Sequence, residues 1–343
     1  MAREGGSLRA VVTGASGLLG GNLAVALLDA GWSVSALRRG GSRVDHLEQW
    51  PISWIDADLS GAEGLTRAFD GADAVFHCAA MVSVRRRPTD ALVDANVRGT
   101  ERVVAAVRQA GVRRLVHCSS VSAVGGSLEG PCTEATRWNL DQFGLDDGYA
   151  ITKHQAEEVV RAEVAGGGLD AVIVNPTFLF GPLDRRPSSG RVIVEVVRGR
   201  VPGGTDGVNN FVDVRDVARG MVLAHDKGRS GERYILGNRS YTYREIFEVI
   251  AGVAGVRPPR WRIPRWASAA AGLAGDLQEW ATGREPTLNS VQVRYAVSTA
   301  FQFSSARAAA ELGWTAGPIE PAIADAITFF RAYGILPGDT GSR

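Results

Sequence analysis

Residues 11–20 read VVTGASGLLG, an apolar run that ends in a glycine-rich turn and continues into a helical pattern. Gly14 and Gly17 allow the backbone to turn sharply and to approach a pyrophosphate, and Gly20 allows the helix to pack close to the strand. The free N–H groups and the dipole at the start of that helix favour a phosphate. An ordinary strand-to-helix turn is the alternative. The position between a clear strand and a long helix favours a dinucleotide-binding turn.

Short apolar runs alternate with helical patterns through the first two thirds of the chain. This alternation indicates parallel strands joined by right-handed crossovers, with helices covering both faces of the sheet. The sequence therefore predicts an α/β fold, a Rossmann-type doubly wound parallel sheet of order 3-2-1-4-5-6 with an added strand. The predicted strands are residues 9–13, 33–37, 52–55, 74–78, 114–118, 171–175, 210–214 and 233–236, and the main helices are 18–30, 96–111 and 149–164.

The pattern changes after Gly181-Pro182, where an Arg-, Gly- and Pro-rich stretch begins, and from Thr242 onward helices alternate with Pro- and Trp-rich connections. We therefore expect a smaller, mostly helical C-terminal lobe that binds substrate. The predicted division is a Rossmann domain at 1–181 and 208–238, a lobe at 182–207 and 239–336, and a tail at 337–343. The ends, 1–7 and 337–343, are expected to be loose.

Composition narrows the class of protein. Among the 343 residues, 38 Lys and Arg balance 37 Asp and Glu, so no basic field attracts nucleic acid. The three cysteines are widely spaced and suit neither a disulfide framework nor a metal site. No apolar run reaches the ~18 residues of a membrane span, and the polar N-terminus does not resemble a secretory signal. These features predict a cytoplasmic enzyme.

Arg38 and Arg39 follow the second predicted strand, about 20 residues after the glycines. An acid there would hold the ribose 2′-hydroxyl of NAD, whereas a guanidinium fits a 2′-phosphate. The pair therefore favours NADP(H), with NAD(H) as the alternative. A solvated basic loop without a binding role is the other interpretation. Ser42 and Arg43 could assist with the same phosphate.

Tyr149 and Lys153 stand four residues apart and so share one face of a predicted helix. A phenol has a reference pKa of about 10, and a nearby ammonium would lower that pKa and make the phenol a usable acid or base. Ser120 lies just past the strand 114–118, at the sheet edge where open α/β folds bind ligands. Its hydroxyl could polarise a substrate oxygen, with Ser119 and Ser122 as rivals.

With these motifs the chain resembles the extended short-chain dehydrogenases/reductases, the NAD-dependent epimerase/dehydratase superfamily. The resemblance is closest to its dihydroflavonol-4-reductase and 3β-hydroxysteroid dehydrogenase-like branch and covers nearly the whole chain, up to residues 303–314. It rests on ordered motifs: Thr13-Gly14-x-x-Gly17-x-x-Gly20, His77-x-Ala79-Ala80, Asn96-x-x-Gly99-Thr100, Ser120, Tyr149-x-x-x-Lys153 and Asn175-Pro176-Thr177 with Gly181-Pro182.

The resemblance implies roles for the matched residues. Ser120 would polarise a carbonyl, Tyr149 would transfer the proton, and Lys153 would tune Tyr149 and hold the nicotinamide ribose. Asn96 would contribute to cofactor binding unless it is only a helix N-cap. Buried packing is expected for His77 and Cys118. The implied cofactor-binding residues are Gly14, Ser16, Gly17, Leu18, Leu19, Gly20, Arg38, Arg39, Asp58, Leu59, Ala79, Ala80, Asn96, Tyr149, Lys153 and Pro176.

Two departures separate this chain from the sugar-nucleotide members that it resembles. Those members usually carry Arg-Pro where this chain has Asn175-Pro176, and an arginine before the late strand, where residues 208–213 hold no cation. A pyrophosphate needs charge-assisted donors, although Arg185, Arg186, Arg191 or Arg215 could substitute. We therefore expect an NADPH-dependent reductase of a small-molecule ketone or aldehyde. A sugar or sugar-nucleotide epimerase is the alternative, and a non-catalytic NADP-sensing protein is a weaker one.

The C-terminal lobe and the helices leave two further expectations. Trp261, Trp266 and Trp280 are expected to pack between helices, with an apolar wall over the nicotinamide or a membrane contact as alternatives. Members of the family that this chain resembles often dimerise through helices corresponding to 96–111 and 149–164. A homodimer through those helices is therefore a further hypothesis.

Overall fold

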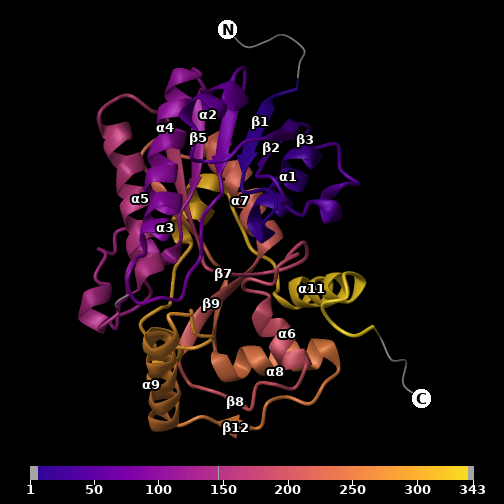
Figure 1. Ribbon diagram of the computed structural model, residues 1–343, viewed down its shortest axis with the longest axis vertical. Helices are drawn as coiled ribbons and strands as arrows, with labels where there is room; N and C mark the ends of the chain where they lie inside the picture. The colour runs from indigo at the N-terminus through magenta and orange to yellow at the C-terminus, as the bar shows by residue number, and fades with distance from the viewer. Residues whose placement is uncertain (1–6, 146, 339–343) are drawn as a thin grey trace.

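Seven parallel strands form the sheet in the upper half of the computed structural model, which describes residues 7–145 and 147–338 (Figure 1). The strand order is β10-β6-β5-β4-β1-β2-β3, which confirms the predicted 3-2-1-4-5-6 order with one added strand. The strands are β1 (Arg9–Thr13), β2 (Ser33–Arg38), β3 (Ser53–Asp56), β4 (Ala74–His77), β5 (Arg114–Cys118), β6 (Ala171–Pro176) and β10 (Arg233–Leu236).

Helices cover both faces of the sheet because neighbouring strand residues point to opposite sides. Val12 joins the core beneath α1 (Leu18–Asp29) and α7 (Val214–Lys227), whereas Val11 joins the core on the other face. That second core lies beneath α2 (Ala62–Phe69), α4 (Gly99–Gln109) and α5 (Gly148–Ala165). All three main helices predicted from the sequence are present.

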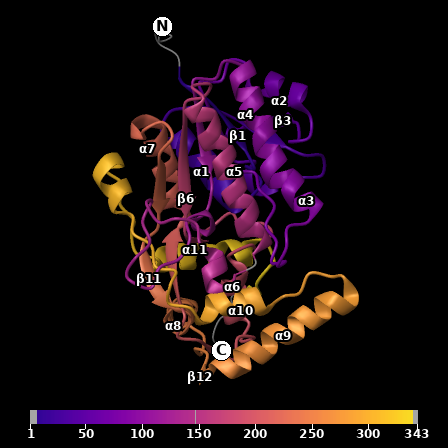
Figure 2. The ribbon, with the colours of Figure 1, turned by 90° about the vertical axis from the view of Figure 1, so that its left-hand side faces the viewer.

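The lobe below the sheet is mostly helical, as expected, and also contains two small sheets (Figures 1 and 2). The strand predicted at 210–214 is β9, which lies in a small sheet of order β11-β9-β7 and not in the main sheet, whereas β10 returns to the main sheet. The division of the chain into domains stays a prediction. The elements outside the main sheet and its covering helices include β7 (Phe178–Phe180), α6 (Arg191–Val197), β8 (Gly203–Gly204), β9 (Val208–Asp213), β11 (Arg239–Thr242), α8 (Tyr243–Ala254), β12 (Trp261–Arg262), α9 (Arg265–Thr282), α10 (Ser290–Val297) and α11 (Glu320–Ala332).

The tryptophans of the lobe do not pack between helices as expected. Trp261, Trp266 and Trp280 are 73%, 76% and 84% exposed. Helix α9 packs on α10 through its small residues instead: a Cβ at Gly272 would stand 2.9 Å from the Cα of Ser290. Close backbone contact occupies the inner face and leaves the large side chains outside.

The helix predicted to begin at residue 96 begins earlier. Thr89 caps α3 (Asp90–Val93), which continues through a π-helical turn, Asp94–Arg98, into α4. Asn96 lies inside this turn, so its interpretation as an N-cap is wrong. Of the loose ends predicted at 1–7 and 337–343, residues 1–6 and 339–343 lie outside the described part of the chain.

Candidate active site

The glycine-rich turn leaves no room for side chains at two of its positions. Gly14 has φ 75°, and a Cβ there would stand 2.6 Å from the backbone nitrogen of Ala79 at the end of β4. A Cβ at Gly20 would collide with the carbonyl oxygen of Gly14. Gly17 is the N-cap of α1 and makes no side-chain cap, so the N–H groups of the first turn are not bonded by a capping side chain. This geometry suits a phosphate at the helix N-terminus.

The remaining residues of the turn lie at the same helix start. Ser16 is half-buried, and Leu18 and Leu19 are buried, so these leucines offer a ligand their backbone rather than their side chains. Ala79 follows β4 and donates its N–H to the hydroxyl of Thr13 at 3.2 Å, and Ala80 is exposed beside it. The turn and the end of β4 therefore form one backbone-lined edge.

Arg38 and Arg39, at the end of β2, have different surroundings. The Nε of Arg38 donates to Asp56 at 2.8 Å across the β2–β3 pairing, whereas Arg39 is exposed. Asp58 accepts the backbone N–H of Ser60 at 2.8 Å, and its hydrogen bonds to Ser60 lower the pKa of its carboxyl. Leu59 is half-buried against Gly99. The predicted adenine-side residues thus cluster at the ends of β2 and β3.

Tyr149, Ser120 and Lys153 meet at the carboxyl end of β5. The Ser120 hydroxyl lies close enough to the phenol of Tyr149 to lower the pKa of that phenol. Lys153 is 3% exposed and donates from Nζ to the carbonyl oxygen of Cys118 at 2.7 Å. Of the rival serines, Ser119 is buried with no hydrogen-bond partner for its hydroxyl, and Ser122 donates its N–H to Ser120. The geometry therefore favours Ser120 over both rivals.

The pKa of Tyr149 differs from the sequence expectation, which was that Lys153 would lower it. Burial raises the pKa of Tyr149, and the hydrogen bond from Ser120 only partly offsets it. Burial also lowers the pKa of Lys153. The ammonium of Lys153 is directed to a backbone carbonyl, so the expected lowering of the phenol pKa by Lys153 is not seen.

Asn96 is buried, and its side chain forms hydrogen bonds to two other segments of the chain. Its amide oxygen accepts the N–H of Met81 at 2.7 Å, and its amide nitrogen donates to Met81 O and to the Thr152 hydroxyl. These bonds join the segment after Ala80 to the helix that carries Tyr149. Asn96 therefore reaches the site through Met81 and Thr152.

Pro176 ends β6 and is buried beside β10.

A buried polar network behind the site escaped the sequence analysis. Glu157 is fully buried and pairs with Arg233 at 3.0 Å. Asn175 donates to Glu157 at 2.8 Å and to the carbonyl oxygen of Ser120 at 2.9 Å. The spacing Tyr149, Lys153, Glu157 places all three on one helix face, which is the signal that could have revealed it.

Two expectations of buried packing have different outcomes. His77 is 1% exposed between the hydroxyls of Thr13 and Thr100, which confirms it as a core residue. Cys118 is only half-buried, and a hydrogen bond with Cys78 lowers the pKa of its thiol. Both thiols border Lys153.

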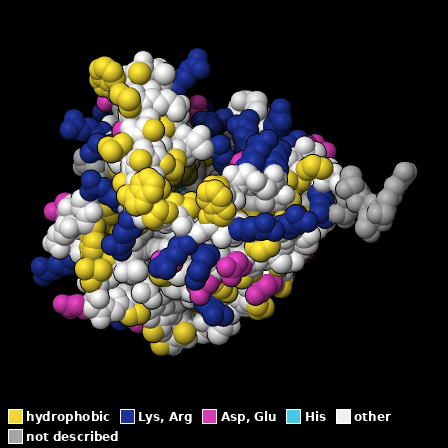
Figure 3. Space-filling view, turned by 90° about the horizontal axis from the view of Figure 1, so that it is seen from below, with side chains coloured by type: hydrophobic (Ala, Val, Ile, Leu, Met, Phe, Trp, Pro, Cys, Tyr) yellow, Lys and Arg dark blue, Asp and Glu magenta, His cyan; other side chains and the backbone are white. Residues whose placement is uncertain are grey.

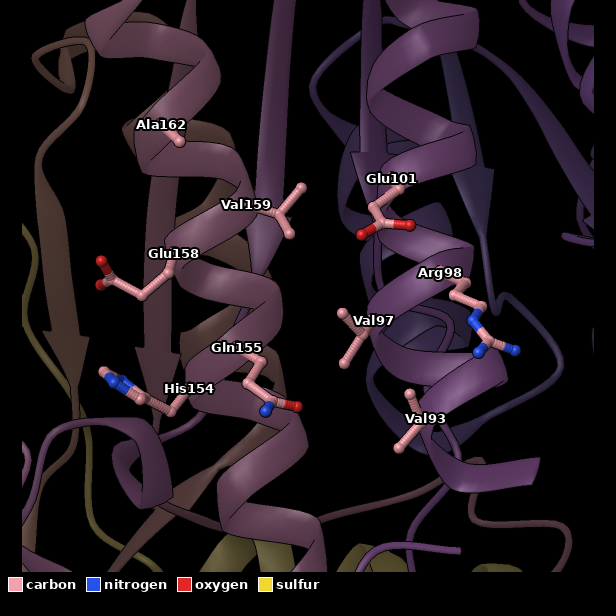
Figure 4. Close-up of a pocket in the computed structure, with 9 residues that line it drawn as sticks. All are labelled: Val93, Val97, Arg98, Glu101, His154, Gln155, Glu158, Val159 and Ala162. Carbon is pink, nitrogen blue, oxygen red and sulfur yellow. The ribbon is translucent and has the colours of Figure 1, made fainter. Parts of the chain in front are cut away.

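A shallow groove lies away from this cluster, between α5 and the continuous helix formed by α3, the π-helical turn and the start of α4 (Figure 4). We call it the α4/α5 groove. Val93 and Val97 point across it toward Val159, and Arg98, Glu101 and Glu158 stand at its borders. The groove occupies the two helices expected to dimerise.

The chain is similar to several known proteins. The NAD dependent epimerase/dehydratase family matches residues 10–237. A Synechocystis protein provisionally named dihydroflavonol 4-reductase is 32% identical over 95% of both chains. Sterol demethylase protein B of Methylococcus capsulatus is 36% identical over 95% of this chain and 99% of its own. The structure of a nucleoside-diphosphate-sugar epimerase from Pseudomonas aeruginosa is similar with a TM-score of 0.80 and 26% identity, covering 96% of this chain and 99% of its own.

Proposed function

The chain belongs to the NAD dependent epimerase/dehydratase family of extended short-chain dehydrogenases/reductases, and within it we propose an NADPH-dependent reductase. Its substrate would be a ketone or aldehyde on a moderately apolar small molecule. The observation that carries the proposal is the phenol of Tyr149 beside the Ser120 hydroxyl, with Lys153 one helical turn away.

The protonation state of Tyr149 suits reduction. A raised pKa keeps the phenol protonated at neutral pH, so Tyr149 would donate the proton to the carbonyl oxygen. The Ser120 hydroxyl would donate a hydrogen bond to that same oxygen as negative charge develops on it. Asn175 supports Ser120 from behind through the Ser120 carbonyl. Lys153 would donate to the ribose hydroxyls of the cofactor.

The residues present fit a nicotinamide dinucleotide. The positions of Gly14 and Gly20 are too tight for any side chain, and the start of α1 offers N–H groups to a pyrophosphate. Ser16, Gly17, Leu18, Leu19, Ala79, Ala80 and Pro176 would line the cofactor, Asp58 and Leu59 the adenine, and Arg38 and Arg39 the 2′-phosphate. When bound, the nicotinamide supplies the hydride from its C4 atom.

A sugar-nucleotide epimerase is the second candidate, favoured by the likeness to the Pseudomonas aeruginosa structure. Two of the arginines that could grip a sugar-nucleotide pyrophosphate are engaged elsewhere. Arg185 pairs with Asp45, and Arg215 pairs with Asp213 and Asp325. The relatives named as a dihydroflavonol reductase and a sterol demethylase protein also favour an apolar substrate.

Nicotinamide absorbance separates the two candidates. The purified chain is mixed with NADPH and, separately, with apolar ring ketones and with nucleoside-diphosphate sugars. Steady loss of NADPH absorbance with a ketone supports the reductase. Interconversion of a nucleotide sugar without net NADPH consumption would replace it with the epimerase.

We also propose that a second copy of the chain packs against the α4/α5 groove. The half-buried Val97 and Val159 supply an apolar centre, and charges of both signs border it.

A further inference from the structure

Among the described residues, most of the large apolar side chains that are exposed lie in one segment. Six of the ten lie between residues 261 and 288. Three of these six are tryptophans, and five are more than 60% exposed. An apolar patch of this kind marks an interaction surface. The six side chains are Trp261, Trp266, Leu273, Leu277, Trp280 and Leu288.

Four of these residues form a continuous stripe along α9. Trp266, Leu273, Leu277 and Trp280 follow one another at spacings of seven, four and three residues, which places them on one helix face. We call them the α9 stripe. The opposite face carries Ser268, Gly272 and Gly275, which are buried. Figure 2 shows α9 running along the lower edge of the lobe, away from the main sheet.

The segment that leads into the α9 stripe is rich in cations. Residues 257–266 contain four exposed arginines and no acid: Arg257, Arg260, Arg262 and Arg265. Arg262 pairs with Asp206. Figure 3 shows hydrophobic side chains and Lys or Arg side chains gathered together on the lower face.

The acids of the segment instead turn toward the body of the protein. Asp276 accepts the N–H of Ser290, Glu279 pairs with Arg85 at 2.7 Å, and Glu285 accepts the hydroxyl of Ser83. The carboxylates of the segment are therefore engaged with the rest of the protein, whereas its arginines and tryptophans are exposed.

We propose that the α9 stripe and these arginines dock on the surface of an anionic phospholipid bilayer. Tryptophan rings prefer the boundary between headgroups and acyl chains, and arginines bind lipid phosphates while their stems cover apolar surface. A symmetric contact with a second copy is disfavoured, because it would bring two arginine clusters together. No helix within residues 7–145 and 147–338 is long and apolar enough to cross a bilayer, so this contact is peripheral. The proposal is independent of the reaction catalysed.

Vesicle flotation with the full chain tests the docking. Vesicles of phosphatidylcholine alone are compared with vesicles that also contain phosphatidylglycerol. We expect binding to the anionic vesicles, weakening at high salt, with a blue shift of tryptophan fluorescence. Equal binding to both vesicle types, or binding to neither, would overturn the proposal.

Paired variants locate the contact. Trp266→Ser with Trp280→Ser, and separately Arg260→Glu with Arg265→Glu, should each weaken binding about tenfold or more. These side chains are exposed, so we expect the variants to fold. Leu128→Ser, which removes a 76% exposed leucine elsewhere, is the matched control and should bind like the unchanged protein. Unchanged binding by both double variants contradicts the proposal. A dimer that dissociates when the tryptophans are replaced also contradicts it, because the α9 stripe would then contact a second copy of the chain.

Discussion

The proton on Tyr149 is held mainly by burial, with further contributions from the charges of Cys118 and Asp147. Burial raises the pKa of the phenol, and the hydrogen bond from Ser120 opposes that rise only in part. A phenol of this kind is a proton donor at neutral pH. The residue is therefore suited to reducing a carbonyl in the state described here, and oxidation would require a further change that favours the phenolate.

Replacing Tyr149 with phenylalanine removes the proposed acid and keeps the ring. We expect turnover of the ketone to fall by about 10²–10⁴-fold, because that is the usual contribution of a positioned acid. NADPH binding, measured by fluorescence titration, should change little. Tyr333→Phe removes a hydroxyl from a half-buried tyrosine in the lobe and serves as the control. Full turnover by the Tyr149 variant would exclude the phenol as the acid.

Arg38 is the residue that we propose to favour NADP(H) over NAD(H). Arg38→Asp replaces a phosphate-binding cation with an acid that can accept a ribose hydroxyl. We expect the dissociation constant of NADPH to rise about 10–100-fold and that of NADH to change far less. Asp56→Asn weakens the partner of Arg38 without removing the cation, and should leave the NADP(H) preference in place. Equal weakening of both cofactors by Arg38→Asp would show that Arg38 does not bind the phosphate.

Strands β4 and β5 carry a pair of buried histidines that links stability to pH. His77 and His117 are register partners, and their rings lie 5.4 Å apart. Burial, with a smaller contribution from the charge of Lys153, lowers the pKa of His77 to about 3 and also lowers that of His117. The unfolded chain takes up protons near pH 6.5, so between about pH 3 and 6.5 it binds protons that the folded chain does not. Stability therefore falls as the pH drops below 6.5.

This linkage can be measured by urea unfolding between pH 5 and 7. Each such histidine contributes a slope that approaches about 1.4 kcal/mol per pH unit well below pH 6.5. His77→Gln keeps a hydrogen-bonding side chain between Thr13 and Thr100 and removes one titrating group. The slope of its unfolding free energy against pH should therefore be smaller, by the contribution of one histidine. Parallel curves for the variant and the unchanged protein would contradict the assignment.

At the level of elements, the helices and strands that were predicted are those with a clear residue pattern. Consecutive apolar residues marked the main strands, and the spacing of Gly14 and Gly20 marked the turn into α1. The strand at 210–214 was predicted, but its place in a separate small sheet was not, since apolar pattern alone does not reveal a strand's neighbours. The π-helical turn around Asn96 has no signal in the residue pattern, and the bonds of Asn96 to Met81 join segments that are far apart in the sequence. The raised pKa of Tyr149 and the exposure of Trp280 depend on three-dimensional burial, which sequence spacing does not report.

In the molecule as a whole, the two proposed contact surfaces lie apart. Helices α4 and α5, which border the groove, lie on the outer side of the sheet layer, and helix α9, which carries the stripe, lies at the lower edge of the lobe (Figures 1 and 2). Tyr149 and Lys153 lie on α5, whose inner side meets the β5 end and whose outer side borders the groove. A charge placed in the groove thus tests self-association without touching the α9 stripe.

A substitution in the groove tests the dimer directly. Val97→Glu combined with Val159→Glu places two carboxylates in the apolar centre, where burying them in a contact would be costly. We expect the unchanged protein to sediment as a dimer at micromolar concentration and the double variant as a monomer that still binds NADPH. Leu128→Glu adds a charge at an exposed site outside the groove and should leave the dimer intact. A monomeric unchanged protein would rule out the groove as a self-association surface, while a dimeric double variant would move the contact to another face.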